Sequence, residues 1–380
     1  MHIPDGYLSP QSCAVLGAAA VPFWATASRR VKRVVTSRHV PLLAIGAAYC
    51  FLVMMFNVPI PDGTTAHAVG AVLVAVLLGP WAAVVAVSVA LAIQALFFGD
   101  GGVLAYGANC FNMAIVMPFV GYGVYRVVAG RTPLTSRRRA IAAGLGGYVG
   151  LNAAALCAAV EFGLQPELFH KADGTPLYAP FHLAQTIPAM LFAHLLVAGV
   201  VELVLTTGVI TYLQRANLPV LRINHPTVPT GGADDAGATV AEGAEGTDEP
   251  AVHPGRLGWR WACVGLGIMA ILTPLGLLAP GGAFGEDSPS DLDLQTYHLD
   301  AVPSGLRHYA GFFHHALFDG YGFQDDAHPT LGYLVSAAVG MLVIAAVIVL
   351  VARMLRVIGS RRSAPTPSAG STRPGVVTPS

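Results

Sequence analysis

The feature that most constrains this chain is a series of long apolar stretches that carry almost no charge. A helix that crosses the hydrocarbon core of a membrane needs about 20 apolar residues. Nine stretches reach or approach this length, over 10–28, 40–57, 66–79, 82–98, 104–128, 140–163, 184–213, 257–279 and 331–354. Hydrophobic residues make up 54% of the chain and charged residues only 11%. We therefore expect an all-α, polytopic membrane protein.

The basic residues predict how these helices are oriented, because Lys and Arg are enriched in cytoplasmic loops. If the N-terminus faces outside, all but two of the 21 Lys and Arg lie on the inner side. The two exceptions are Lys171 and Arg307. An odd number of spans then places the C-terminus inside.

A stretch of different composition divides the chain. Residues 224–254 include PTGGADDAGATVAEGAEGTDEP, which is rich in Gly, Ala and acidic residues and is typical of a disordered connector. We predict a seven-helix bundle over 1–223, the connector, and a two-helix unit over 255–357. The two-helix unit holds an outer loop at about 280–330, and a disordered tail follows over 358–380.

The chain begins MHIPDGYLSP, without the basic segment of a signal peptide. Ser9 and Pro10 suit the N-cap and first turn of a helix. Because His2 is a large second residue, we expect Met1 to remain on the mature chain. The terminal amine, the next backbone nitrogen and the His2 imidazole can then close two adjacent chelate rings on one metal ion. The planar peptide group holds these three nitrogens close to one plane.

A fourth nitrogen is available at His67, which ends the outer loop NVPIPDGTTAH. Four nitrogens in a square suit Ni(II) or Cu(II), with Co(II) possible. The alternative is that both imidazoles only pack or cap, which is the commoner role of a histidine at a helix mouth. We predict Met1, His2 and His67 as metal ligands.

Three segments carry a resemblance to a known family. They are MHIPDGYLSP at the terminus, VPIPDGTTAHAVGAVLVAVLLGPWAA, and QALFFGDGGVLAYGANCFNMAIVMPFVGYGVY. Over about residues 1–215 the chain resembles the CbiM/NikM family, the substrate-binding (S) components of cobalt and nickel energy-coupling factor (ECF) transporters. The resemblance implies a metal site made by the Met1 amine, the backbone nitrogen and imidazole of His2, and His67.

The last third of the chain carries a second resemblance. Its segments PLGLLAPGGAFGED and LGYLVSAAVGMLVIAAVIVL are similar to the two-span CbiN/NikN companion, which is often fused to the binding subunit. Where that family commonly has a Pro-Asp-Gly-type motif in the outer loop, this chain has SPSDLDL.

The resemblance implies the substrate-capture subunit of an ATP-driven importer of Ni(II) or Co(II) in a prokaryotic inner membrane. Its partners would be a membrane coupling subunit of the CbiQ/NikQ type and cytoplasmic ATPases of the CbiO/NikO type. The ion is then the transported substrate, and we expect no permanent cofactor. We expect the protein to contact membrane lipid and not to bind nucleic acid.

Two further classes of protein compete with this interpretation. A permease or channel that needs no ATPase remains an alternative. An enzyme is not expected, because the sequence holds neither a Gly-x-x-x-x-Gly-Lys-Ser/Thr phosphate loop nor an HExxH motif.

Several polar residues near the outer ends of the helices are candidates for supporting the metal ligands. They are Asn57, Asp62, Thr65, Gln94 and Asn109. Hydrogen bonds between helices are the alternative role for these amides and for Asn112. Turn formation is sufficient to explain the Asp-Gly pairs that begin at Asp62 and Asp100.

Two other groups of ionisable residues have open roles. His194 and Glu202 share one face of a predicted span and could form a proton or ion path, a brace, or a partner contact. The outer loop of the second unit holds His298, His308, His314, His315 and His328 together with several Asp residues. It could collect metal ions loosely, or simply be a solvated polar loop.

Overall fold

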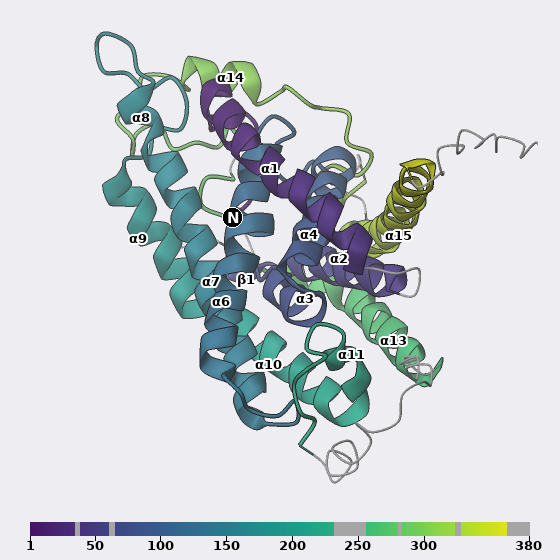
Figure 1. Cartoon of the computed structure of the whole chain (residues 1–380). Coiled ribbons are helices and arrows are strands. Elements are labelled where there is room, and N and C mark those ends of the chain that lie inside the picture. Colours follow the sequence, from purple (N-terminus) through teal and green to yellow (C-terminus); the bar gives the residue numbers. More distant parts are fainter. Residues whose placement is uncertain are drawn as a thin grey trace, which may run out of the picture.

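The structure of the protein is a computed structural model that describes residues 1–34, 39–60, 65–231, 256–279, 283–286, 288–323 and 328–362. Helices dominate these residues (Figure 1). Within them the only strands are β1 (Val58–Pro59) and β2 (Thr65–Ala66), which pair antiparallel.

The predicted seven-helix unit forms a bundle in which several spans are built from more than one helical segment. The first segments are α1 (Pro10–Val34), α2 (Val40–Met54), α3 (Ala71–Leu78), α4 (Pro80–Phe98), α5 (Tyr106–Asn109), η1 (Cys110–Val116) and α6 (Met117–Ala129). They are followed by α7 (Arg137–Gly163), α8 (Gln165–Leu168), α9 (Leu183–Ala193), η2 (His194–Ala198), α10 (Gly199–Ala216) and α11 (Leu218–Arg222). The η1 and η2 segments are π-helical turns, a geometry that is frequent at functional sites.

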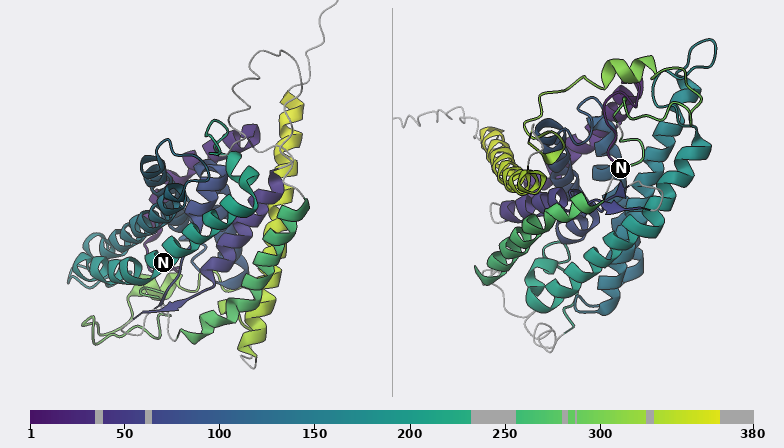
Figure 2. Two further views of the ribbon diagram at one scale, coloured as in Figure 1. Left: turned by 90° about the horizontal axis from the view of Figure 1, so that it is seen from below. Right: turned by 180° about the vertical axis from the view of Figure 1, so that it is seen from behind.

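The predicted two-helix unit consists of a helix pair and an irregular loop. Its elements are α13 (Arg256–Leu272), η3 (Thr273–Leu278), α14 (Ser304–Tyr309), η4 (Asp319–Tyr321) and α15 (Pro329–Arg362). The loop before α14 reaches across the bundle to the N-terminus, as both views of Figure 2 show.

All nine predicted spans fall on helices. Among the described residues, six helices are long and apolar enough to cross a membrane. They are Pro80–Phe98, Tyr106–Ala129, Arg137–Leu168, Leu183–Ala216, Trp261–Leu278 and Pro329–Met354. Helix α2 is apolar but shorter, with 15 residues, and α3 has only 8. The prediction of a polytopic, all-α membrane protein is confirmed.

The third predicted span begins later than expected. Its first residues form β2 and a loop, and helix α3 starts only at Ala71. Gly70 precedes the helix with φ of +77°, in the left-handed region that favours glycine. This break in helical geometry leaves His67 in a loop before the helix.

Small residues let the central helices touch. A Cβ atom on Gly146 of α7 would lie 2.5 Å from the carbonyl oxygen of Gly121 in α6. A Cβ atom on Gly150 would likewise lie 2.6 Å from the carbonyl oxygen of Met117. Backbones that approach this closely gain packing contacts that larger residues would prevent.

The N-terminal segment and the basic residues lie at opposite ends of α7. Tyr7 packs against Phe162 at the end of this helix, with ring centroids 5.9 Å apart. Arg139 lies at the beginning of α7, where it donates a hydrogen bond of 2.7 Å to the Tyr125 hydroxyl. A helix of 27 residues is about 40 Å long, which matches the distance across a membrane.

The two predicted units pack against each other. Helix α15 lies along α2, and Gly340 meets the ring of Phe51 so closely that a Cβ atom would collide with it. Tyr321 stacks on Phe98, with ring centroids 5.1 Å apart. The predicted boundary between the units therefore runs through a packed interface.

The first residues of the predicted connector, 224–231, are ordered against the inner end of the bundle. The Leu134 amide donates to the Pro229 carbonyl at 2.8 Å, and the Thr135 hydroxyl donates to the Thr230 carbonyl at 2.7 Å. The rest of the connector and the tail from residue 363 onward lie outside the described residues. The predicted division into domains thus stays a prediction.

Candidate metal centre

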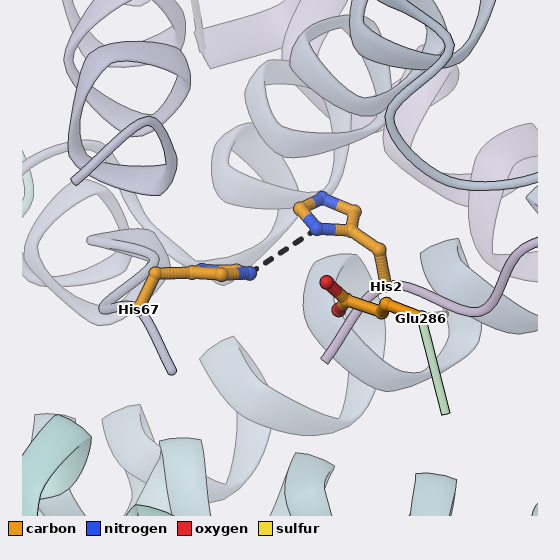
Figure 3. Close-up of side chains that lie close together, drawn as sticks. All are labelled: His2, His67 and Glu286. Carbon is orange, nitrogen blue, oxygen red and sulfur yellow. Dashed lines mark hydrogen bonds between the residues drawn. The ribbon is translucent and has the colours of Figure 1, made fainter. Parts of the chain in front are cut away.

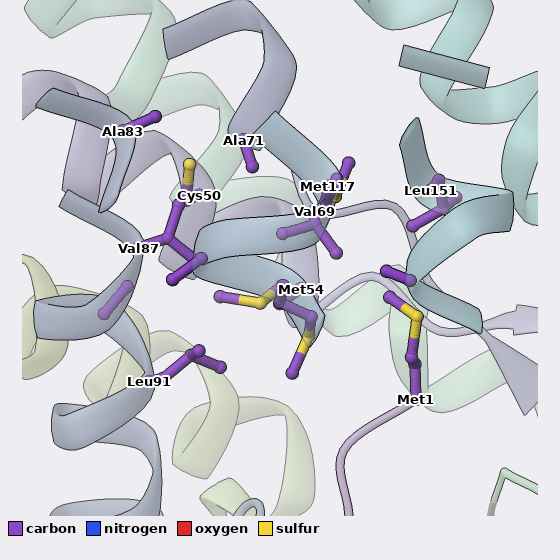
Figure 4. Packing of buried hydrophobic residues seen from close by; sticks show 14 of the residues in the cluster. Met1, Cys50, Met54, Val69, Ala71, Ala83, Val87, Leu91, Met117 and Leu151 are labelled. Carbon is purple, nitrogen blue, oxygen red and sulfur yellow. The ribbon is translucent and has the colours of Figure 1, made fainter. Parts of the chain in front are cut away.

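The first nine residues form a buried segment that is not helical. Ser9 caps α1, since its hydroxyl accepts a hydrogen bond of 3.0 Å from the Ser12 amide, and Pro10 opens the helix as predicted. Gly6 has φ of +91° and turns the chain. The Met1 side chain is 1% exposed and lies in the apolar core near Met54 and Val69 (Figure 4).

Asn109 of α5 and the loop before this helix anchor the N-terminal segment at Ile3. The Asn109 side chain accepts from the Ile3 amide at 2.8 Å and donates to the Ile3 carbonyl at 3.0 Å. The Gly102 amide donates to the same carbonyl at 2.8 Å. Because a side chain at Gly102 would collide with Asp5, glycine in the FFGDGG sequence allows the two segments to touch.

Asp5 adds a second anchor. Its carboxylate accepts hydrogen bonds from the amides of Val103, Leu104 and Ala105, at 3.1, 2.8 and 3.1 Å. Successive amides that converge on one carboxylate stabilise the negative charge. The chain is therefore held on both sides of the turn, and this fixes the direction in which residues 1 and 2 extend.

The imidazoles of His2 and His67 face each other in the core. The His2 Nδ1 atom lies 3.1 Å from the His67 Nε2 atom, and the two side chains are 1% and 2% exposed (Figure 3). Bonds from imidazole nitrogen to a first-row metal ion are about 2.0–2.1 Å, so adjacent corners of a square lie about 2.9 Å apart. The two nitrogens are therefore spaced as neighbouring ligands of one ion.

The backbone fixes the tautomer of His67. Its Nδ1 atom lies 3.1 Å from the Ala68 carbonyl oxygen, which can only accept, so the Nδ1–H group donates this hydrogen bond. The Nε2 lone pair is then directed at His2. A ligating histidine usually donates its other ring nitrogen in this way.

Glu202 holds the segment that follows His67. Its carboxylate accepts hydrogen bonds of 2.9 Å from the amides of both Val69 and Gly70, and Thr206 donates to it at 3.4 Å. These amides are the free donors at the start of α3. The contacts favour the brace among the roles that the sequence left open for Glu202.

His194 lies in η2, beside β2. Its Nδ1 atom is 2.7 Å from the Met190 carbonyl, and its Nε2 atom has no hydrogen-bond partner within the described part of the chain. Its role as part of a path or a brace stays a prediction.

Two carboxylates that sequence reasoning did not place at the site border it. The Glu286 Oε1 atom accepts from the Met1 amine at 2.5 Å, and the Asp100 Oδ1 atom lies 3.2 Å from His2 Nδ1. His2, His67 and Glu286 form the only group of three potential side-chain ligands found among the described residues, with ligand atoms within 4.8 Å of one another. The acidic residue in GAFGED was the available signal for Glu286, but nothing in its spacing connects it with residues 1–67.

Burial and charge set the protonation of these groups. Burial lowers the pKa of His2 to about 4, so this imidazole is neutral at neutral pH with its nitrogen free to ligate. Burial also raises the pKa of Asp100 to about 6. For Glu286 burial acts to raise the pKa, but the positive charge of the Met1 amine, its hydrogen bond to the carboxylate, and the imidazoles once they are protonated outweigh burial and bring the pKa to about 2.

The remaining candidates for supporting residues lie at different distances from the ligands. Thr65 is buried in β2 and forms a parallel bridge with Ala283 from the loop that carries Glu286. Asn57 is half-buried beside Gly276 of η3. Asp62 lies outside the described residues.

Gln94 and Asn112 form hydrogen bonds between segments. Gln94 donates to Asp100 at 3.1 Å and to the Tyr321 hydroxyl at 2.8 Å, so it orients the carboxylate next to His2. Asn112 donates to Glu161 of the neighbouring helix α7 at 2.8 Å. Gln94 thus has a supporting contact with the site, and Asn112 has the interhelical role.

A comparison of the sequence with known protein families shows which family the chain belongs to. The sequence model of the family described as "Cobalt uptake substrate-specific transmembrane region", CbiM, matches residues 2–219. The chain belongs to the CbiM family. The match includes His2 and His67 and begins directly after Met1.

Curated relatives extend the similarity to the C-terminal part of this CbiM-family chain. A "Fused nickel transport protein NikMN" of Rhodobacter capsulatus is 46% identical over 359 residues, which cover 91% of this chain and 95% of the relative. A "Probable fused nickel transport protein LarMN" of Lactiplantibacillus plantarum is 44% identical and covers 90% and 95% of the two chains. Both matches reach beyond the CbiM region into the two-helix unit.

A solved structure supports the fold of the bundle. A crystal structure described as that of a truncated transition metal transporter is 58% identical in sequence, with a TM-score of 0.53. The similarity covers 56% of this chain and 98% of that chain. The chain is thus a multi-pass membrane protein of a family of transport proteins.

Proposed function

We propose that the protein captures Ni(II) or Co(II) on the outer side of the membrane as the substrate-binding subunit of an ATP-driven importer. The observation that carries this proposal is the pairing of His2 Nδ1 with His67 Nε2 at 3.1 Å, in a buried cluster that also holds the terminal amine. The family match and the names of the nickel and cobalt transport relatives support it.

In this proposal the ion is bound by four nitrogens. They are the Met1 amine, the His2 backbone nitrogen, His2 Nδ1 and His67 Nε2. The Nδ1 atom is the ring nitrogen of His2 that can close a six-membered chelate ring with its own backbone nitrogen, and it is also the one that faces His67. Binding releases the protons of the amine and of the amide, which makes the affinity higher at higher pH.

The protein's contribution is to hold these nitrogens in place before the ion arrives. The contacts of Ile3 with Asn109 and of Asp5 with residues 103–105 fix the terminal segment. Glu202 fixes the backbone after His67. An ordered site loses little conformational freedom on binding, and this favours high affinity.

Energy for transport comes, in this proposal, from a coupling membrane subunit of the CbiQ/NikQ type and ATPases of the CbiO/NikO type. These partners reorient the bundle so that the ion leaves on the inner side. The second candidate function is a permease that needs no ATPase, and it would use the buried ionisable residues His194 and Glu202 within the span.

Uptake by reconstituted vesicles separates the two candidates. Purified protein with its native N-terminus is first tested for equilibrium binding of Ni(II) and Co(II), and a square-planar absorption spectrum is expected with Ni(II). Vesicles that hold the protein alone are then compared with vesicles that also hold the coupling subunit and ATPases. We expect uptake only in the second set and only with ATP; uptake by the protein alone would establish the permease.

A further inference from the structure

Glu286 is the member of the buried cluster that comes from the C-terminal unit. Its carboxylate points toward the two imidazoles, with ligand atoms of all three side chains within 4.8 Å (Figure 3). The nitrogen ligands of the proposed site all come from residues 1–67, so this oxygen has no part in the four-nitrogen square. The position of Glu286 beside the ligands therefore indicates a function other than that of a fourth or fifth ligand in the final site.

The turn that carries Glu286 is built into the bundle. Ala283 bridges Thr65 in β2, next to the strand end that leads to His67. The Phe284 ring packs on Phe181 with centroids 4.8 Å apart, and the Glu286 amide closes the turn on the Ala283 carbonyl at 2.9 Å. These contacts direct the carboxylate at the amine.

Gly285 allows the turn to lie this close to the bundle. It has φ of +77°, and a Cβ atom there would come 2.9 Å from the ring of Phe162. Phe162 also packs on Tyr7 in the N-terminal segment. The N-terminal segment and the Glu286 turn are thus seated on the same aromatic residue, which fixes them relative to each other.

Exposure shows which group an ion from solvent meets first. The side chains of Met1, His2 and His67 are at most 2% exposed, whereas those of Glu286 and Asp100 are each 20% exposed. A hydrated dication is attracted to carboxylates, whose oxygen atoms can serve as its ligands. The solvent side of the cluster is therefore anionic and oxygen-bearing, and its buried side is nitrogen-bearing.

The two carboxylates differ in how they are held. Asp100 is fixed by hydrogen bonds from the Tyr321 hydroxyl at 2.5 Å and from Gln94 at 3.1 Å, besides its contact with His2. The contact found for the Glu286 carboxylate is the one with the amine. When the Met1 amine binds an ion, Glu286 loses its contact with the amine. Of the two carboxylates, Glu286 is therefore the one that can bind an ion and then release it.

We propose that Glu286 is the loading ligand through which the C-terminal unit supplies divalent transition-metal cations to the nitrogen site. This inference rests on the proposed function. The arriving cation exchanges water for a Glu286 carboxylate oxygen. The bond between cation and carboxylate is then replaced by bonds to the amine and its neighbouring nitrogens, while the amine and amide protons pass to solvent and the carboxylate is left free.

The test is the rate at which the full-length protein takes up Ni(II). Glu286→Gln keeps the size of the side chain and removes its charge, and Glu286→Asp keeps the charge but shortens the reach. Glu167→Gln is the matched control. Glu167 is an exposed carboxylate at the same end of the bundle, and its side chain forms a hydrogen bond with His182. Each variant is mixed rapidly with nickel chloride, and the absorption of the bound ion is followed.

We expect Glu286→Gln to slow association about tenfold, in the range by which local charge alters encounter rates. Its final spectrum and ion content should match those of the unchanged protein, Glu286→Asp should be intermediate, and Glu167→Gln should be unaffected. An unchanged or faster rate in Glu286→Gln, or equal slowing in Glu167→Gln, overturns the loading role. If the unchanged protein binds no ion at all, the proposed function itself fails, and this outcome is distinct.

Discussion

Two regions of this molecule carry histidines and acidic residues, and they are organised in opposite ways. The cluster of His2, His67 and Glu286 brings together residues that are far apart in the chain and buries both imidazoles. The loop of the C-terminal unit holds five histidines within about 30 residues, and all five side chains are exposed. Among the described residues only the first region forms a group of three potential side-chain ligands.

The comparison teaches that density of ligand types along the sequence is a poor guide to a metal site. His314 and His315 are adjacent in the loop and their rings lie 4.3 Å apart, but both stay in contact with solvent. An exposed imidazole stays hydrated until an ion displaces its water, whereas the ring of His67 is already buried and is held by its hydrogen bond to Ala68. Of the two roles left open by the sequence for the loop, its geometry favours a solvated polar surface.

The largest effect that would test this contrast comes from the chain terminus itself. We predict that extending the chain by two residues before Met1 lowers Ni(II) affinity at least a hundredfold. The extension converts the terminal amine into an amide, which removes one ligand, and it places new atoms where Met1 contacts Glu286. Isothermal titration of the purified protein measures the change, with the same two residues added at the C-terminus as the control. Retained tight binding by the N-terminal extension would remove the amine from the ligand set.

The histidines of the two regions can be compared directly. We predict that His67→Ala lowers Ni(II) affinity about a hundredfold, because the square loses one of its four nitrogen ligands. The double variant His314→Ala, His315→Ala removes twice as many imidazoles and should change the affinity less than twofold. The same titration measures both. Comparable losses in the two variants would mean that the loop takes part in binding.

A smaller effect is expected where the protein only holds the terminal segment. Asn109→Ala removes both hydrogen bonds to the Ile3 backbone and leaves a buried amide and carbonyl without this partner. Leaving a buried donor or acceptor unpaired costs about 1–3 kcal/mol, and the middle of this range corresponds to the affinity loss of about thirtyfold that we predict. The spectrum of the bound ion should be unchanged, since all four nitrogens remain. A changed spectrum would mean that Asn109 does more than position the segment.

Much of this organisation could be predicted from sequence because it depends on local pattern. The apolar stretches predicted helices at all nine positions, and Ser9 with Pro10 predicted the start of α1. The ligand candidates Met1, His2 and His67 followed from chelate chemistry and from the family resemblance, and the structure brings them into one cluster. The chelate of Met1 and His2 could be predicted because it lies within two consecutive residues, whereas His67 comes from a loop 65 positions further along the chain.

The contacts that the sequence did not predict all depend on the fold. Glu286 meets Met1 across 285 positions of the chain, and Glu202 reaches the amides of Val69 and Gly70 across more than 130. The Asp5 carboxylate anchors the loop before α5 about 100 positions away. A single acidic residue gives no local signal of its partner, because any loop acid could satisfy the same pattern.

The smallest predicted effect separates the two roles that the sequence left open for Glu202. Glu202→Gln removes the charge but keeps an oxygen that can accept from Val69 and Gly70. A hydrogen bond to a charged group stabilises by about 1 kcal/mol more than a neutral one, so a brace predicts less than tenfold weaker Ni(II) binding and continued uptake. A proton or ion path needs the ionisable group itself and predicts normal binding with uptake abolished. Titration with Ni(II) and ATP-driven uptake in vesicles, both measured on Glu202→Gln, distinguish these outcomes. Thr206→Val is the control, because it removes only the weaker hydrogen bond of 3.4 Å to Glu202. Because the carboxylate accepts from two consecutive amides at the start of α3, the brace is the outcome that we expect.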